Sequence, residues 1–107
     1  VLEPDADTGA YRIKNMNTNM YLSVKGGSTA EGANIIQTKN LSDSSLWKLT
    51  EVEDGWFSII NYESGLAITR GQPGAFEKPT ERFAVQKNYT GADNQLWGFD
   101  YGKPSIT

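Results

Sequence analysis

Hydrophobic and polar positions alternate in short stretches along most of the chain. In residues 10–15 and 56–61 the apolar side chains occupy every second position, as Tyr11 and Ile13 or Phe57 and Ile59 do. Glycine, asparagine and aspartate separate these stretches, and no window shows a helical period. The pattern predicts strands over residues 10–15, 20–25, 34–38, 46–52, 56–61, 66–70, 82–87 and 96–101. An all-β sandwich or barrel follows from it.

The second four strands repeat the first four. Residues 11–15 align without gaps with residues 57–61, 46 positions later, and the offset reaches 50 at Trp47 and Trp97. The offset changes in glycine-bearing loops, where insertions cost little. A duplication is therefore predicted within one domain, residues 1–107. Repeat one covers about residues 10–54 and repeat two about 55–101, and 102–107 form a tail or the start of a third repeat.

Composition and charge exclude several classes of function. The formal net charge is −3 and the ten basic residues are scattered, which argues against a nucleic-acid partner. No stretch approaches the roughly 20 apolar residues of a membrane span. The first residues lack the features of a signal peptide, so we expect a mature or excised segment. The chain has no cysteine and no histidine, so we expect no metal, no cofactor and no enzymatic activity.

The fourth strand of the second repeat carries a known motif. Residues 91–97, Gly-Ala-Asp-Asn-Gln-Leu-Trp, resemble the glutamine-x-tryptophan signature of ricin-type lectin domains. Residues 32–37 resemble the third strand of that family, and residues 11–15 and 55–61 resemble its first strand. The resemblance implies a β-trefoil, in which three four-stranded repeats share one core. Two repeats are recognisable here, so the third is missing or is supplied from elsewhere, by a longer polypeptide or by another chain.

Several side chains are assigned to the interior on this basis. Trp47 and Trp97 are expected to be the large core residues, together with Phe57 and Phe99. Trp56 starts a strand at the repeat junction and fits either the core or a binding site, of which we expect the core. Gln95 is expected to hydrogen-bond turn backbone and to hold the loop beside it. The two repeat tryptophans and the two phenylalanines therefore receive no ligand role.

The sugar-binding positions of the family are altered in this chain. Family sites use an aspartate at the end of strand two, an aromatic residue near the end of strand three and the asparagine before the glutamine. Ser23 and Thr69 stand at the aspartate positions, and Thr38 and Lys87 at the aromatic ones. Residues 44–45, both serine, replace the asparagine–glutamine pair of repeat one. Sugar binding of the usual kind is therefore not expected at repeat one.

Repeat two keeps more of a binding site. Asn94 precedes Gln95, Asp93 lies beside it, and Tyr89 is available as a replacement surface for stacking on a sugar ring. Capping of a turn is the commoner use of an aspartate–asparagine pair, and this reading stays open. The candidate carbohydrate-binding residues are Thr69, Lys87, Tyr89, Asp93 and Asn94.

The first residues have a weak calcium-loop pattern. Residues 5–9 read Asp-Ala-Asp-Thr-Gly, but Met16 stands where a calcium loop would need its final glutamate. We therefore expect a flexible, solvated terminus.

The sequence predicts a non-catalytic, lectin-like module that binds a glycan or polysaccharide. We expect it to be part of a larger secreted protein, extracellular or on the cell surface. A structural or protein-interaction trefoil with degenerate sugar sites is the alternative, and the altered aspartate and aromatic positions favour it. A trefoil protease inhibitor acting through the loop at residues 71–79 is a third reading.

Overall fold

Short strands joined by tight turns form the whole of the described structure. The computed structural model describes residues 1–70, 84–100 and 103–106, with side chains up to residue 98. The strands are β1 (Leu2–Pro4), β2 (Tyr11–Ile13), β3 (Tyr21–Val24), β4 (Ile35–Thr38), β5 (Trp47–Glu53), β6 (Trp56–Asn61), β7 (Ala67–Arg70), β8 (Ala84–Lys87), β9 (Trp97–Asp100) and β10 (Lys103–Ile106). Within these described ranges, three single turns of 3₁₀ helix are η1 (Lys25–Gly27), η2 (Asp43–Ser45) and η4 (Asp93–Gln95). In the described part of the chain, no helix is long and apolar enough to cross a membrane.

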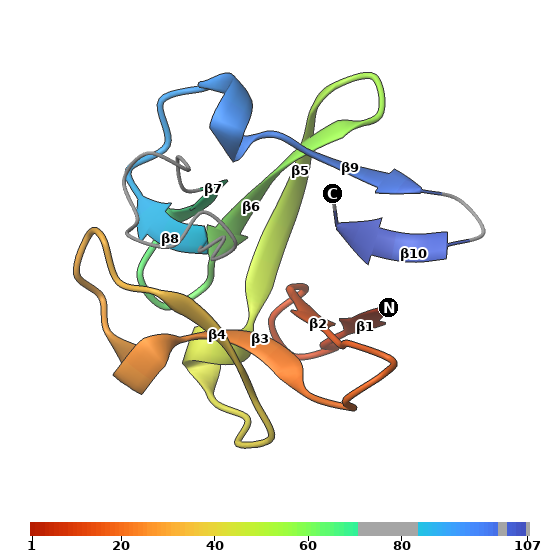
Figure 1. The fold of residues 1–107 in the computed structure, drawn as a ribbon, viewed down its shortest axis with the longest axis vertical. Coiled ribbons are helices and arrows are strands. Elements are labelled where there is room, and N and C mark those ends of the chain that lie inside the picture. Colours follow the sequence, from red (N-terminus) through yellow and green to blue (C-terminus); the bar gives the residue numbers. More distant parts are fainter. Residues whose placement is uncertain (71–83, 101–102, 107) are drawn as a thin grey trace, which may run out of the picture.

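The eight strands predicted from the alternating pattern are all present, as β2 to β9, within a few residues of their expected bounds. The first and fourth strands of the repeats pair in the order β1-β2-β5-β6-β9-β10. The second and third strands form the hairpins β3–β4 and β7–β8 (Figure 1). The β7–β8 hairpin joins the curled sheet through the pairing of β7 with β6, and β3–β4 is a separate two-stranded sheet. The predicted all-β fold with two four-stranded repeats is confirmed. Strands β1 and β10 were not predicted.

The two repeat tryptophans lie in one apolar core. Trp47 is 0% exposed and Trp97 7%, and both pack with Ile59. The indole nitrogen of Trp47 donates a hydrogen bond to the carbonyl oxygen of Leu22 at 3.0 Å, and that of Trp97 donates to the carbonyl of Ile68 at 3.1 Å. Each indole thus ties the fourth strand of its repeat to the second. This confirms the predicted role of both tryptophans.

Trp56 is not a core residue, and the prediction for it was wrong. Its side chain is 46% exposed, because the tip of the β5–β6 hairpin extends beyond the core, with Val52 also 44% exposed. The ring rests on the backbone of Gly98, where an added Cβ would lie 3.5 Å from the ring. Phe57 is half-buried, and the side chain of Phe99 lies outside the described residues.

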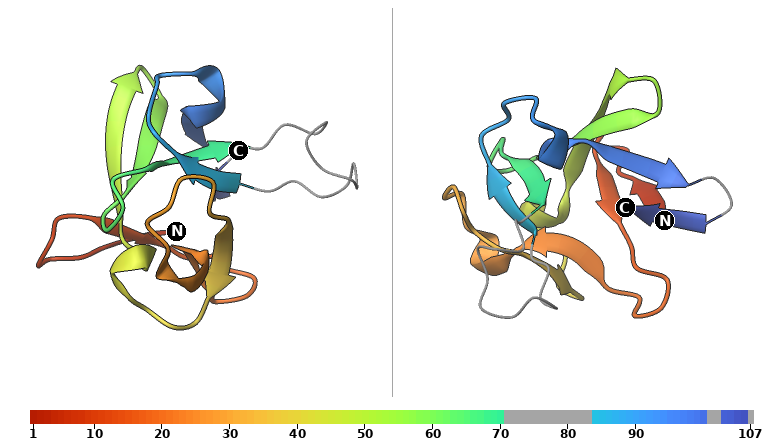
Figure 2. Two further views of the ribbon diagram at one scale, coloured as in Figure 1. Left: turned by 90° about the vertical axis from the view of Figure 1, so that its left-hand side faces the viewer. Right: turned by 45° about the horizontal axis from the view of Figure 1, so that its top comes forward.

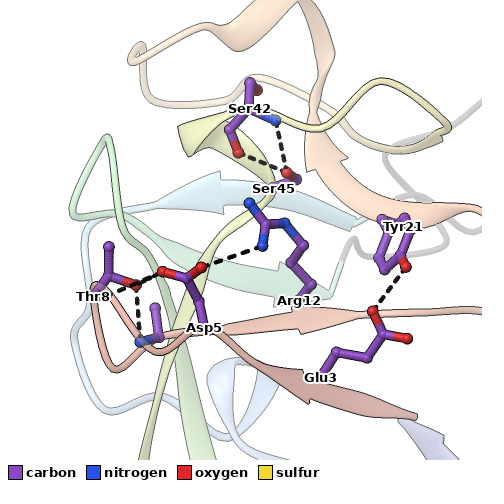
Figure 3. A network of polar contacts seen from close by, with 8 residues as sticks. Glu3, Asp5, Thr8, Arg12, Tyr21, Ser42 and Ser45 are labelled. Atoms are coloured by element: carbon purple, nitrogen blue, oxygen red, sulfur yellow. Dashed lines mark hydrogen bonds and ion pairs between the residues drawn. The ribbon is translucent and has the colours of Figure 1, made fainter.

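The N-terminal segment is ordered, which corrects the expected flexible terminus. Strand β1 pairs with β2, and the Asp5 carboxylate accepts hydrogen bonds from the backbone nitrogen and the hydroxyl of Thr8, at 3.1 and 2.7 Å. Arg12 forms an ion pair with the same carboxylate at 3.4 Å (Figure 3). The hydrogen bond from the Thr8 hydroxyl is the largest cause that holds the pKa of Asp5 below its ordinary value, and the positive charge of Arg12 adds to it. The segment is ordered because it pairs with the free edge of β2.

Replacing Glu3 by glutamine should lower the pKa of Tyr21. The Tyr21 hydroxyl donates to a Glu3 carboxylate oxygen at 2.7 Å, and this bond, with the negative charge, raises the pKa of the tyrosine. A raised pKa means that the bond stabilises the fold fully below the unfolded pKa of about 10 and is lost as the pH rises through the folded value. Ultraviolet absorbance titration at alkaline pH measures the shift. Asp7→Asn, at an exposed carboxylate, is the control, and an unchanged titration in Glu3→Gln would contradict the assignment.

Candidate functional site

The hairpin of β7 and β8 has one face toward the Ile59 core cluster and another toward η4. Ala67 pairs with Lys87 and Thr69 with Val85, so these four side chains share that face, because alternate residues of a strand point the same way. Ile68, on the other face, belongs to the core cluster. The hairpin therefore places Thr69 and Lys87, both candidate site residues, on the same face, with Thr69 buried and Lys87 exposed.

Gln95 fastens the segment after β8 to this hairpin. Its side-chain nitrogen donates to the Asn88 carbonyl at 2.8 Å and to the Thr69 hydroxyl at 3.1 Å. Its side-chain oxygen accepts from the backbone nitrogen of Thr90 at 2.8 Å and from the Thr90 hydroxyl at 3.2 Å. The amide thus uses both donors and its acceptor oxygen while only 2% exposed. We call these four bonds the Gln95 bracket, and they confirm the expected structural role of Gln95.

Thr69 is buried beneath the bracket. Its side chain is 5% exposed, and its hydroxyl donates to the Ala67 carbonyl at 3.1 Å while it accepts from Gln95. The hydroxyl therefore has an internal partner both as a donor and as an acceptor. A ligand could hydrogen-bond the Thr69 hydroxyl only by displacing the Ala67 carbonyl or the Gln95 amide. In the present structure the hydroxyl positions Gln95.

The other four candidate residues lie on the segment that Gln95 holds. Tyr89 is 41% exposed, Lys87 and Asp93 are exposed, and Asn94 is half-buried next to the bracket. The turn between them needs Gly91, whose φ of 81° lies in the left-handed region. The surface thus offers one aromatic face, one cation and one carboxylate within eight positions of chain. Such a set can stack on a ring and hydrogen-bond its hydroxyls.

Glu31 is a further polar residue beside this surface, and sequence reasoning missed it. Its carboxylate accepts a hydrogen bond from the backbone nitrogen of Asn88 at 3.0 Å, across 57 positions of sequence. It belongs to the loop between β3 and β4 of repeat one, which the fold places against repeat two. A second carboxylate therefore lies at the backbone of Asn88, the residue before Tyr89. No pattern local to either segment pointed to this contact.

Repeat one lacks an equivalent of the bracket. Ser45 stands in the glutamine position, but its hydroxyl bonds only Ser42, to the carbonyl at 2.6 Å and from the backbone nitrogen at 3.0 Å (Figure 3). The hydroxyls of Ser23 and Ser44 are hydrogen-bonded to each other at 2.9 Å. These short side chains connect η2 with β3 and do not hold the segment that follows β4. The candidate site is therefore confined to repeat two.

Two other chemical readings concern a metal site and the loop at residues 71–79. Among residues 1–70 and 84–98, no group of three or more acidic side chains could hold a metal ion. The loop at residues 71–79, considered for protease inhibition, lies outside the described residues. The described part of the candidate site is thus a polar surface that includes the exposed ring of Tyr89.

Comparison with known families and structures agrees with the fold. The sequence model of the ricin-type β-trefoil lectin domain-like family matches residues 1–79. A designed threefold-symmetric protein, ThreeFoil, is similar with a TM-score of 0.73 and 29% identity over 91% of this chain and 67% of its own. A comparison with curated proteins gives no match.

Two natural proteins of known structure share the fold. An exo-β-1,3-galactanase from Clostridium thermocellum is similar with a TM-score of 0.76 and 33% identity, over 94% of this chain and 22% of its own. A Polyporus squamosus lectin, solved with the human-type influenza-binding epitope Neu5Acα2-6Galβ1-4GlcNAc, has a TM-score of 0.72 and 21% identity, over 91% of this chain and 33% of its own. The chain therefore spans a third or less of either natural protein.

Proposed function

Because the chain belongs to the family of ricin-type β-trefoil lectin-like domains, we propose that it is a non-catalytic carbohydrate-binding module. Its setting is a larger secreted protein, located outside the cell or at the cell surface. The observation that carries the proposal is the Gln95 bracket, which holds exposed Tyr89 beside the β7–β8 hairpin. The proposed binding residues are Thr69, Lys87, Tyr89, Asp93 and Asn94.

Binding would combine ring stacking with hydrogen bonds. The apolar face of a sugar ring packs on Tyr89, and the hydroxyls bond the Asp93 carboxylate, the Asn94 amide and the Lys87 ammonium. Bonds to the charged groups are roughly twice as strong as neutral ones, so Asp93 and Lys87 contribute most to orientation. Thr69 acts from below by holding Gln95. A single shallow site is weak, and multivalency in the parent protein raises the affinity.

Galactose-containing glycans are the first ligands to test. The galactanase that resembles the chain acts on a β-1,3-galactan, and the lectin structure contains a sialylated galactose epitope. Since the chain covers 22% of the galactanase, the module resembles a part of that enzyme, and attachment to a catalytic domain fits the proposal. The chain lacks histidine and cysteine, so the proposal assigns it binding and no bond cleavage.

Replacing Tyr89 by alanine should weaken sugar binding about tenfold, which corresponds to about 1.4 kcal/mol. The reason is loss of the stacking face, while the exposed position of Tyr89 leaves the fold intact. Calorimetric titration with β-1,3-galactan oligosaccharides and with sialyl-lactosamine measures the effect. Tyr62→Ala is the matched control, because Tyr62 is 38% exposed and lies at the end of β6. Binding of neither sugar class by the wild-type chain would refute the proposed function, and equal loss in both variants would refute the site.

A protein-interaction module is the second candidate. The observation in its favour is that the Thr69 hydroxyl is occupied by internal bonds and that no aspartate stands at Ser23 or Thr69. Failure of glycan binding, together with specific capture of a polypeptide that Tyr89→Ala abolishes, would favour this function over the first.

A further inference from the structure

The backbone around Tyr89 is held by two side chains from different repeats. The Gln95 amide bonds the Asn88 carbonyl at 2.8 Å and the backbone nitrogen of Thr90 at 2.8 Å, so it holds the two peptide units that flank Tyr89. The peptide unit before these two is held from repeat one, because the Glu31 carboxylate accepts a hydrogen bond from the Asn88 backbone nitrogen at 3.0 Å. Three consecutive peptide units thus have side-chain partners.

The loop that carries Glu31 is fastened to β8. The backbone nitrogen of Gly32 donates to the Gln86 carbonyl at 2.7 Å, and the side-chain nitrogen of Gln86 donates to the Ala30 carbonyl at 2.8 Å. Figures 1 and 2 show this loop, between β3 and β4, beside β8. Both chain neighbours of Glu31 are therefore bonded to one residue, Gln86, which is 0% exposed. The Glu31 backbone is thus held in place independently of its carboxylate.

The hydrogen bond to Asn88 is the contact that the described structure gives the Glu31 side chain. Glu31 is exposed, and it forms no ion pair with residues 1–70 or 84–98. A bond to a charged acceptor is stronger than a neutral one, and an anchored backbone lowers the entropy that is lost when the bond forms. The carboxylate therefore acts on the backbone of the segment that carries Tyr89.

We infer that Glu31 is a positioning residue of the carbohydrate site around Tyr89, supplied by repeat one to a site in repeat two. As a statement about that site, the inference rests on the proposed function. The Glu31 carboxylate holds the nitrogen of Asn88 and the Gln95 amide holds its carbonyl oxygen, so the Tyr89 ring is preorganised for stacking on a sugar. Without Glu31 the first of the three peptide units is no longer fixed, and the ring samples orientations that do not stack.

Replacing Glu31 by alanine should weaken glycan binding about fivefold, because the Tyr89 segment is then held by Gln95 alone. Glu31→Gln should keep the affinity within about twofold of the wild type, because the amide oxygen accepts the same bond from Asn88. Calorimetric titration with β-1,3-galactan oligosaccharides and with sialyl-lactosamine measures the affinities. Rescue by glutamine separates positioning through the backbone from a direct role of the negative charge.

Glu51→Ala is the matched control. The Glu51 carboxylate accepts a hydrogen bond from the Gly55 backbone nitrogen at 3.1 Å, so this variant loses a bond of the same kind in the β5–β6 hairpin. It should leave the glycan affinity unchanged. Amide hydrogen exchange adds a readout that needs no glycan. Exchange at Asn88 should be about fivefold faster in Glu31→Ala and close to the wild-type rate in Glu31→Gln, whereas Glu51→Ala should accelerate exchange at Gly55.

The outcomes separate the inference from the proposed function. Wild-type affinity in Glu31→Ala, or the same loss of affinity in Glu51→Ala, would overturn the inference and leave the proposed function standing. If Glu31→Gln bound glycan as weakly as Glu31→Ala while its Asn88 amide stayed protected, the carboxylate would contact the sugar itself, and the positioning role would be wrong. A wild-type chain that binds neither sugar removes the proposed function, and the inference falls with it.

Discussion

Replacing Trp47 by alanine should lower the free energy of unfolding by about 3–5 kcal/mol, enough to unfold much of the protein at 37 °C. The side chain is 0% exposed, so the substitution leaves a large cavity between β5 and the core residues around Ile59. It also removes the donor to the Leu22 carbonyl, and an unpaired buried carbonyl costs about 1–3 kcal/mol. Urea denaturation followed by circular dichroism measures the change.

Two further variants separate burial from aromatic character. Trp47→Phe keeps most of the ring and loses the indole donor, so it should cost less than the alanine variant. Trp56→Ala should cost less than about 1 kcal/mol, because that side chain is 46% exposed. If Trp47→Ala were no more destabilising than Trp56→Ala, the repeat tryptophans would not form the common core.

Local pattern was sufficient for the strands inside each repeat. Alternation at Tyr11 and Ile13, and its recurrence at Phe57 and Ile59, predicted both strands because a half-buried strand has a period of two. It could not predict β1, because three residues are too few to show a period and the strand depends on pairing with the free edge of β2. Trp56 was misassigned for a related reason. The pattern gives the face of a side chain but not the point at which a hairpin extends beyond its core.

The candidate site was predicted in part. Gln95 was recognised because the motif places it directly before Leu96 and Trp97, and a buried glutamine amide needs backbone partners. The contact of Glu31 with Asn88 depends on docking of one repeat on the other, which no local pattern encodes. Burial of Thr69 depends on a contact within repeat two, because η4, which is 24 or more positions away in sequence, covers it after folding. The single domain over residues 1–107 stays a prediction.

Replacing Gln95 by alanine should lower the free energy of unfolding by about 3 kcal/mol and weaken sugar binding more than tenfold. The substitution removes all four bonds of the bracket and leaves the Asn88 carbonyl and the Thr90 nitrogen without their partner. The segment that carries Tyr89 then loses its fixed position over the hairpin, so the ring is no longer preorganised for stacking. Denaturant unfolding and calorimetric titration with the same glycans measure the two effects.

Matched variants distinguish positioning from general destabilisation. Gln95→Glu keeps the shape and the acceptor for Thr90, but a carboxylate cannot donate to the Asn88 carbonyl, so binding should fall in this variant too. Ser45→Ala changes the equivalent position of repeat one, where the hydroxyl bonds only Ser42, and should leave glycan affinity unchanged. If Gln95→Glu bound glycan as the wild type does, the bracket would not position the site. Equal loss of affinity in Ser45→Ala would mean that any weakening of the fold abolishes binding, and repeat two would then have no special role.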